Sequence, residues 1–479
     1  MEFDLTKKYC YYFKKITEIP HGSGNEKALS DYIAGFGRSK GFTVFQDEFH
    51  NVIIDKPASA GCENAEPLIL QAHIDMVCEK NKGVEHDFEK DPLDLYVDED
   101  GWLHAKGTTL GADDGTGAAY MMAILDDDTL KNPPLSCIFT VMEEIGLVGA
   151  SKLKKENIHG KRLINLDGGG ETVTCTTSAG GCRAEIFFPF EAQANDRPAY
   201  LLGVRDLKGG HSGGKIHEEL GNANIIAARI LKEASLAGID LSLSSFTGGL
   251  KYNAIPREAD IVFVSEDAFE KIQAVIGEIT AKIAKELEFS DAGFRVLLEK
   301  TDAETVLNKN DSDRFLNYMF LMPNGFRHRS MAVEGLTTAS LNAGVVHTKE
   351  NCFVIDDLIR SALASDTDLL IEQLETLGGL LGVTVKIGER YGGWAYVEKS
   401  PMRDILASVV ESKGKELKYR ASHGGLECGI FKAVIPEMDI ITYGPIAEGA
   451  HTPDEKLDLA SFDRSYDILC DVVRACAEQ

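Results

Sequence analysis

The stretch at residues 67–75, PLILQAHID, decides the fold class. It is a short, continuous apolar run that ends in a histidine and an aspartate, and such runs are typical of strands buried on both faces of a sheet. A sheet of this kind needs helices on each side, so the run favours an α/β domain. In an extended backbone His73 and Asp75 point to the same side. A carboxylate that holds an imidazole is a feature of metal sites, although a His-x-Asp pair alone is more often incidental.

The segments around this run alternate between strands and helices. We expect strands at 42–45, 51–55, 67–72, 136–142 and 162–167, and helices at 25–40 and 118–125. Because the strands are apolar almost throughout, this order predicts a mixed sheet covered on both faces. Ligands of such sheets bind beyond the carboxyl ends of the strands.

From about residue 199 the order of elements changes. Strands at 199–207, 240–246, 259–265 and 293–299 and helices at 218–236 and 267–287 follow the βαββαβ order of a ferredoxin-like unit. A helix at 311–321, strands at 339–347 and 352–360, a helix at 366–379 and a strand at 382–389 nearly repeat that order, as in a degenerate tandem. The α/β pattern resumes with a helix at 401–413, a strand at 438–443 and a helix at 460–477. We therefore predict a catalytic α/β domain at 1–189 and 394–479, interrupted by an inserted α+β domain at 190–393.

Composition limits the function classes. The 479 residues carry a formal net charge of −26, which argues against binding to nucleic acid or to anionic membrane surfaces. No run approaches the roughly 18 apolar residues of a membrane span, and the N-terminal residues lack the apolar core of a secretory signal. The ten cysteines include no C-x-x-C pair, which is typical of thiols in a reducing compartment. We expect a cytoplasmic protein.

Acidic pairs mark the start of one predicted helix and the end of one predicted strand. Asp113 and Asp114 precede the helix at 118–125, and a helix N-cap would explain one of them well. It explains the other poorly, and a loop carboxylate that bridges cations is an equally weighted interpretation. Glu143 and Glu144 end the strand at 136–142, where a solvated turn and a site with two carboxylates in two roles are both consistent with the pattern.

Two further positions complete the set. Asp167 ends the strand at 162–167, and His451 lies in a Gly- and Pro-containing loop after the strand at 438–443. Five such features at separate strand or helix ends are expected to meet at one edge of the sheet. Two histidines with several carboxylates suit Zn²⁺ or Mn²⁺ better than Mg²⁺ or Ca²⁺, and their number permits two metals that share one carboxylate.

Motifs along essentially the whole chain resemble the M20 family of co-catalytic zinc peptidases. They are QAHIDMV (71–77), GTTLGADDGTG (107–117), TVMEEIGLVGA (140–150), LINLDG (163–168) and GAHTPDE (449–455). The resemblance is narrowed to the aminoacyl-histidine (Xaa-His) dipeptidases by LKGGHSGGKIHEELGNAN (207–224), YNAIPREA (252–259), SHGGLECGIF (422–431) and GPIAEGAHTPDE (444–455).

The resemblance implies a role for each residue of the set. His73 and Asp167 would bind one zinc, Glu144 and His451 the other, and Asp113 would bridge both. Asp75 would orient His73, and Glu143 would be the general base that moves a proton from the attacking water to the leaving amine. A cis peptide bond between Asp113 and Asp114 is also implied. The choice of Asp113 over Asp114, and of Glu143 over Glu144 as the base, rests on the family pattern, because spacing decides neither. Gly168 and Asp114 depart from residues frequent in the family and remove no ligand.

The predicted insertion supplies candidates for substrate binding. The resemblance implies that His211 stabilises the oxyanion, from the partner subunit in dimeric relatives, and that Asn253 contacts the substrate. From the residues alone, a polar turn is the favoured interpretation of His211. Arg360 is a candidate clamp for the substrate's C-terminal carboxylate, with a surface ion pair as the alternative. The segment that begins at His423 would line a wall of the site, while His217, Glu427 and Cys428 are interpreted as structural.

The function implied is a metallodipeptidase with two Zn²⁺ per subunit, for which Mn²⁺ or Co²⁺ could substitute. It would hydrolyse unblocked dipeptides, including Xaa-His and β-alanyl-His, and would form a homodimer through the inserted domain. One alternative keeps the site but changes the substrate, as in a tripeptidase or an N-acyl amino acid deacylase. A metal-binding regulatory protein without turnover is a second alternative, against which the intact Glu143 argues.

Overall fold

The computed structural model describes residues 3–478 and divides the chain into two compact units. Unit 1 comprises Met1–Thr177, Trp394–Ala421 and Leu426–Gln479, and unit 2 comprises Ser178–Gly393 and Ser422–Gly425. None of the helices in the described residues has the length and apolar character needed to cross a membrane. The ten cysteines are all free thiols.

Unit 1 is built on a six-stranded mixed sheet in the order β1-β2-β6-β3-β7-β23. The strands are β1 (Thr43–Gln46), β2 (Val52–Lys56), β3 (Leu68–His73), β6 (Leu135–Thr140), β7 (Arg162–Asn165) and β23 (Asp439–Thr442). The pairs β6–β3, β3–β7 and β7–β23 are parallel, while β1–β2 and β2–β6 are antiparallel. Every residue of β3 is buried, as the apolar run predicted.

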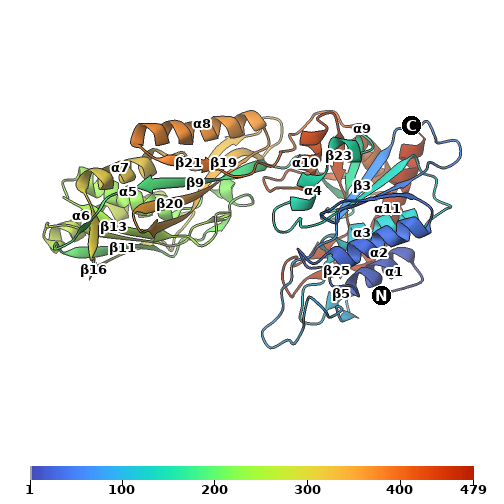
Figure 1. Cartoon of the computed structure of the whole chain (residues 1–479), viewed down its shortest axis with the longest axis horizontal. Helices are drawn as coiled ribbons and strands as arrows, with labels where there is room; N and C mark the ends of the chain where they lie inside the picture. Colours follow the sequence, from blue (N-terminus) through green and yellow to red (C-terminus); the bar gives the residue numbers. More distant parts are fainter. Residues whose placement is uncertain (1–2, 479) are drawn as a thin grey trace. The chain divides into compact units, whose positions relative to one another are not determined.

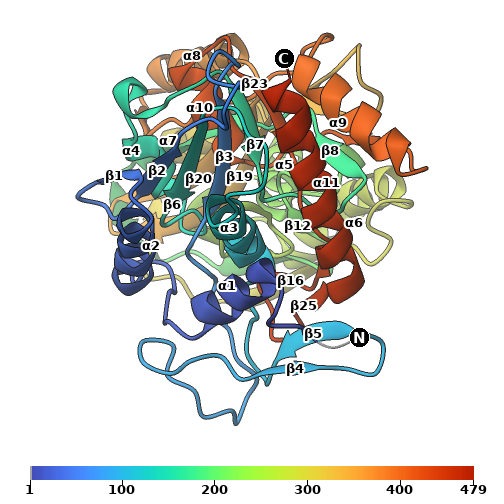
Figure 2. The same ribbon diagram turned by 90° about the vertical axis from the view of Figure 1, so that its right-hand side faces the viewer.

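Helices cover both faces of this sheet, which confirms the predicted fold class. They are α1 (Lys8–Thr17), α2 (Lys27–Ser39), α3 (Ala112–Leu125), α4 (Val148–Lys152), α9 (Pro401–Ser412), α10 (Glu427–Val434) and α11 (Leu459–Ala477). Leu68, Leu70 and Ala72 of β3 share one core with α1, α3 and α11, which lie in front of the sheet in Figure 2. Gln71, on the opposite face of β3, contacts Glu427 of α10.

Shorter strands connect segments of unit 1 that are distant in the sequence. A four-stranded sheet has the order β24 (Ala447–Glu448), β25 (Lys456–Asp458), β5 (Trp102–Ala105) and β4 (Leu95–Val97). A two-stranded parallel pair joins β8 (Val173–Cys175) to β22 (Lys418–Arg420). The first of these sheets holds the loop that carries His451.

Unit 2 contains a nine-stranded antiparallel sheet whose main order is β16-β11-β15-β13-β19-β20-β9-β21. Its strands are β9 (Gly180–Pro189), β11 (Ala199–Arg205), β13 (Ser242–Gly248), β15 (Ala259–Val264), β16 (Arg295–Thr301), β18 (Gly325–Arg329), β19 (Thr337–Lys349), β20 (Cys352–Ser361) and β21 (Thr384–Ile387). Helices α5 (Ala223–Leu236), α6 (Phe269–Glu286), α7 (Lys309–Leu321) and α8 (Ala364–Leu381) pack on one face of it (Figure 1). Short pairs join β10 (Ala192–Ala194) to β17 (Thr305–Leu307), and β12 (Gly210–His211) to β14 (Ala254–Ile255).

The sheet order shows two ferredoxin-like halves side by side. The first half is β11-α5-β13-β15-α6-β16, and the second uses β9, α7, β19, β20, α8 and β21 in the same spatial arrangement. They join where β13 pairs with β19. The first strand of the second half, β9, thus precedes the whole first half in the chain. The predicted boundary at 189/190 placed this strand in the wrong unit, because a strand separated by about 120 residues from its own helix gives no local sign of its partner.

Candidate metal centre

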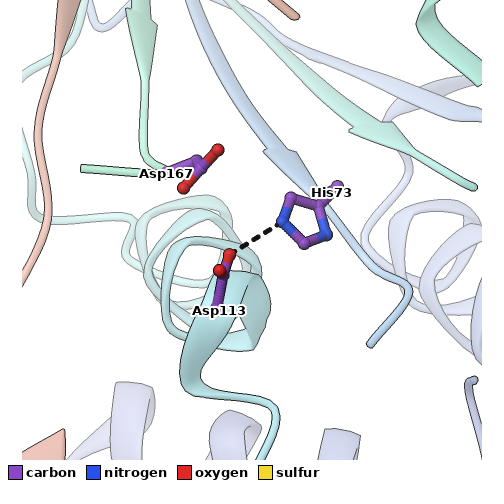
Figure 3. A group of neighbouring side chains, drawn as sticks. All are labelled: His73, Asp113 and Asp167. Carbon is purple, nitrogen blue, oxygen red and sulfur yellow. Dashed lines mark hydrogen bonds and ion pairs between the residues drawn. The ribbon is translucent and has the colours of Figure 1, made fainter. Parts of the chain in front are cut away.

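Most of the predicted ligands lie where the central parallel strands of unit 1 end. His73 is the last residue of β3, Asp167 follows β7, and the pair Glu143–Glu144 follows β6. Because parallel strands end at the same edge of a sheet, these side chains meet there. Figure 3 shows His73 and Asp113 turned toward each other, with Asp167 beside them at its strand end.

Asp113 lies between the two histidines. Its Oδ1 is 3.0 Å from His73 Nε2, and its Oδ2 is 3.4 Å from His451 Nε2. The potential ligand atoms of His73, Asp113 and Asp167 lie within 4.8 Å of one another, and so do those of Asp113, Glu144 and His451. Asp113 therefore belongs to two adjacent groups, each able to hold one ion.

Glu144 and Glu143 differ in their surroundings, although both lie near His73. The ligand atoms of His73, Glu143 and Glu144 form a third group within 4.8 Å. Only Glu144 also approaches the second histidine, since its Oε1 is 2.9 Å from His451 Nε2. That oxygen is buried and has no hydrogen-bond partner among the described residues. A short contact without hydrogen-bond alignment fits two ligands of a common cation, and this mixed nitrogen and oxygen donor set suits Zn²⁺ or Mn²⁺.

The turn that presents the two glutamates depends on Asp75. Met142, directly before them, has a positive φ of 52°, which turns the chain sharply after β6. Asp75 Oδ1 then accepts a hydrogen bond from the backbone N–H of Glu143 at 2.9 Å, and Oδ2 accepts one from Glu144 at 3.2 Å. His73 Nδ1 is 3.0 Å from the backbone carbonyl of Asp75 and 3.5 Å from its carboxylate. The main chain of Asp75 is thus the nearer partner of His73, and its carboxylate holds the glutamate turn.

Asp113 and Asp114 divide the two roles that the sequence left open. Asp114 is buried, and its Oδ1 accepts a hydrogen bond from the Gly117 N–H at 3.1 Å, so it caps the continuing helix. A Cβ at Gly117 would lie 2.5 Å from that oxygen, which explains the glycine. The peptide bond between the two aspartates is cis, as the family resemblance predicted.

Buried negative charge dominates the electrostatics of this edge. Burial raises the pKa of Glu143 to about 8 and raises the pKa of Asp167 well above its ordinary value. The pKa of His451 rises to about 10, because the carboxylates of Asp113 and Glu144 face its ring. The pKa of Asp113 is lowered despite its burial, since both histidines face it. Crowded carboxylates of this kind are what a bound cation would stabilise.

A buried polar network lies behind the site. Gln71 Nε2 and Thr140 Oγ1 donate to Glu427 Oε2 at 2.5 and 2.8 Å, and Asn165 Nδ2 donates to Gln71 Oε1 at 2.7 Å. The network links α10 to β6, β3 and β7, and burial raises the pKa of Glu427 to about 7. The sequence interpretation of Glu427 as structural did not foresee that it adds a further carboxyl group to this region.

The predicted substrate-binding residues lie together within unit 2. Burial and then the Arg360 cation lower the pKa of His423 to about 3 and also lower that of His211. His423 Nε2 is 2.7 Å from Ser340 Oγ, and Ser340 is paired with Arg360 across β19 and β20. The Ser212 N–H donates to the Asn253 carbonyl at 2.9 Å, which connects the loops of His211 and Asn253.

Arg360 is not a surface residue. It is 6% exposed, and in the described part of the chain no carboxylate lies within ion-pair distance of it. Its Nη1 donates to Tyr391 Oη at 3.3 Å, while its Nε has no partner among the described residues. The surface ion pair considered from the sequence is therefore wrong. Neither Ser340 nor Tyr391 was foreseen, because neither belongs to a recognisable motif.

Comparisons with known proteins identify the family and the fold. The family described as Peptidase family M20/M25/M40 matches residues 69–475. The cytosol non-specific dipeptidase of Escherichia coli (strain K12) is 36% identical over 467 residues, which cover 96% of each chain. The crystal structure of aminoacylhistidine dipeptidase from Vibrio alginolyticus aligns with a TM-score of 0.91 and 35% identity, covering 99% of this chain and 98% of that one. Aminopeptidase PepT from Bacillus cereus, at 15% identity and a TM-score of 0.57 over 99% of this chain and 100% of that one, shares the fold.

Proposed function

Because this chain belongs to peptidase family M20/M25/M40 and is a peptide hydrolase, we propose that it is a dipeptidase that uses two zinc ions. One observation carries the proposal: the two carboxylate oxygens of Asp113 face two different histidines, His73 and His451. A carboxylate in that position can bridge two cations. The proposed substrates are unblocked dipeptides, with Xaa-His and β-alanyl-His among them.

We assign the metal ligands as follows. His73 and Asp167 hold one ion, Glu144 and His451 hold the other, and Asp113 holds both. When bound, the two ions would polarise the scissile carbonyl and lower the pKa of an attacking water to about 7. Mn²⁺ or Co²⁺ could replace Zn²⁺ at such a donor set.

Glu143 is the proposed general base. It lies beside the ligands but does not share the approach of Glu144 to His451, so its carboxylate is free to take the proton of the attacking water. Burial favours the protonated carboxyl group, as its raised pKa of about 8 shows. Nearby cations would lower that value. A carboxyl group with a pKa near neutrality can accept the proton and return it to the leaving amine.

Unit 2 contains the residues that we propose recognise the substrate. The buried guanidinium of Arg360 can bind a carboxylate through two parallel hydrogen bonds, which selects peptides with a free C-terminus at that point. His423 is neutral at physiological pH because its pKa is lowered to about 3, and its Nδ1 is buried without a partner among the described residues. We propose that His423 and Asn253 contact the substrate and that His211 stabilises the oxyanion. One relative is described as non-specific and the other as acting on aminoacylhistidines, which is compatible with a preference for C-terminal histidine within a broader range.

We also propose a homodimer formed through unit 2, in the cytoplasm. The helical face of this unit has a hollow of about 720 Å³ between α7 and α8, lined both by apolar residues such as Leu321 and Leu380 and by polar ones such as Arg327, Glu372 and Gln373. Leu321 and Leu380 are exposed by 61% and 78%. Exposed leucines surrounded by polar side chains are typical of an interface between subunits. The ten free thiols and the name of the cytosolic relative support the compartment.

Metal content and hydrolysis of a small peptide panel test the proposal. The purified protein should contain two Zn²⁺ per chain and hydrolyse Xaa-His dipeptides, and chelation should abolish hydrolysis until Zn²⁺ or Mn²⁺ is returned. N-acetyl-His and a tripeptide in the same panel distinguish a deacylase or a tripeptidase from a dipeptidase. Hydrolysis that survives complete removal of metal would contradict the proposal.

A further inference from the structure

The carboxylate of Glu455 accepts hydrogen bonds from four consecutive backbone N–H groups. Its Oε2 accepts from Leu110 at 2.7 Å and Gly111 at 3.0 Å, and its Oε1 accepts from Ala112 at 2.9 Å and Asp113 at 3.3 Å. The side chain is buried, with 2% of the residue exposed. Although burial raises the pKa of Glu455, these N–H groups oppose that rise.

These four donors surround the start of α3. The first N–H groups of a helix have no partner within the helix, and the helix dipole favours an anion there. The residue at the N-cap position, Gly111, has no side chain that could accept them. Glu455 supplies the missing acceptor from a segment more than 300 residues away in the sequence.

The same residue is connected to the second histidine of the centre. Glu455 ends the turn that contains His451, and its N–H donates to the Thr452 carbonyl at 3.1 Å. His451 has a positive φ of 65°, so its ring direction depends on how this turn is held. The side chain of Glu455 therefore holds the backbone of Asp113, and the backbone of Glu455 is part of the turn that contains His451.

We propose that Glu455 is a positioning residue that sets the separation of Asp113 and His451 for metal binding. The proposal rests on the proposed di-metal function. Asp113 Oδ2 and His451 Nε2 lie 3.4 Å apart, although they come from segments with no common strand. The four N–H groups now share two acceptor oxygens, and a glutamine would offer them only one. Its NH₂ group would also face N–H groups, which are donors and cannot accept a hydrogen bond. An aspartate would keep the negative charge, but its side chain is one methylene shorter, so the carboxylate would lie farther from the four N–H groups.

Zn²⁺ affinity of the full chain tests this role. Metal-free wild-type protein, Glu455→Gln and Glu455→Asp would be titrated with Zn²⁺ against a chromophoric chelator. Both variants should bind Zn²⁺ roughly 10–100-fold more weakly, as is usual when a residue that orients ligands is lost. Glu448→Gln is the matched control, because Glu448 is an exposed carboxylate of the same loop and should leave Zn²⁺ affinity unchanged.

Thermal unfolding of the metal-free proteins separates positioning from general support of the fold. A merely structural residue would lower metal-free stability and leave Zn²⁺ affinity intact, and that result for either folded variant would overturn the inference. If Glu455→Gln does not fold, Glu455→Asp decides by the same titration. Wild-type protein that binds no Zn²⁺ would instead overturn the proposed function, so the two failures are distinguishable.

Discussion

Asp75 Oδ1 accepts a hydrogen bond from the backbone N–H of Glu143 at 2.9 Å, which ties the end of β3 to the turn after β6. The second carboxylate oxygen holds the next N–H, that of Glu144, at 3.2 Å. With both backbone groups held, the two adjacent glutamate side chains have defined directions. Only one of them approaches His451. A single aspartate therefore gives two chemically identical neighbours different surroundings.

Replacing Glu143 with glutamine should remove proton transfer and keep the metal. We expect kcat to fall by roughly 10²–10⁴, because a positioned general base contributes about that factor. Zn²⁺ content should stay at the wild-type value, since the proposed ligand atoms are untouched. Steady-state kinetics checks the fall in kcat, and metal analysis checks the Zn²⁺ content. A variant with wild-type kcat would contradict the assignment of the base.

Glu144→Gln should give the opposite result. Losing a proposed ligand should weaken Zn²⁺ binding by more than the roughly 10–100-fold that loss of an outer contact costs. Activity should recover in part when excess Zn²⁺ is supplied, which does not help a variant that lacks the base. Chelator titration followed by assays across Zn²⁺ concentrations measures this, and equal Zn²⁺ affinity of Glu144→Gln and wild type would exclude Glu144 as a ligand.

Arg360→Lys should impair recognition of the substrate carboxylate. A lysine cannot form the two parallel hydrogen bonds of a guanidinium, and bonds to charged groups contribute about 1.5–3 kcal/mol. We expect kcat/KM for a dipeptide to fall roughly 10–100-fold, mainly through KM. The loss should shrink for the same dipeptide with a C-terminal amide.

A matched substitution in the same unit checks that this effect is local. Arg183 forms an ion pair with Asp356 at 2.7 Å and is not assigned to the substrate. Arg183→Lys should leave kcat/KM near the wild-type value. Equal losses in both variants would point to a general effect on unit 2 and contradict the clamp.

His423 should make unit 2 less stable in acid. Its pKa is lowered to about 3 in the folded protein, while an unfolded histidine titrates near 6.5. Above pH 6.5 both states are neutral at this residue. As the pH falls below 6.5 the unfolded state binds the proton and the folded state does not, so the free energy of unfolding decreases. The decrease between pH 7 and pH 5 is at most about 2 kcal/mol.

Urea unfolding of His423→Gln at the two pH values measures this contribution. The variant should lose less stability than wild type when the pH is lowered from 7 to 5, whatever its stability at pH 7. His328→Gln, at an exposed position of the same unit, serves as the control. A wild-type pH dependence in His423→Gln would show that His423 titrates normally in the folded protein.

Much of the fold could be predicted because the signals were local. The apolar run at Leu68–His73 is typical of a buried strand, and the elements gave one complete βαββαβ order in unit 2 and the αββαβ part of the second. The boundary failed at β9 because its partners, β20 and β21, follow about 165–200 residues later. The short strands that hold the loop of His451 were missed, since two- and three-residue strands carry no periodicity.

In the candidate metal centre, too, some features were predictable from local sequence and others were not. Residue types at strand ends predicted which side chains would gather, and the family resemblance predicted the cis bond at Asp113. The roles of Asp75 and Glu455 as acceptors of backbone N–H groups were not predictable, because a carboxylate in a motif does not reveal which main chain it will meet.

The sequence by itself determined three things about this protein: a buried mixed sheet, histidines and carboxylates at its strand ends, and the M20 motifs that contain them. The tertiary structure alone decided how adjacent identical residues differ. Asp113 faces two histidines while Asp114 caps a helix, and Glu144 meets His451 while Glu143 does not. The physical reason is that spacing along a chain defines which residues are neighbours. The direction of each side chain depends on backbone hydrogen bonds made by residues such as Asp75 and Glu455, which folding brings from distant segments.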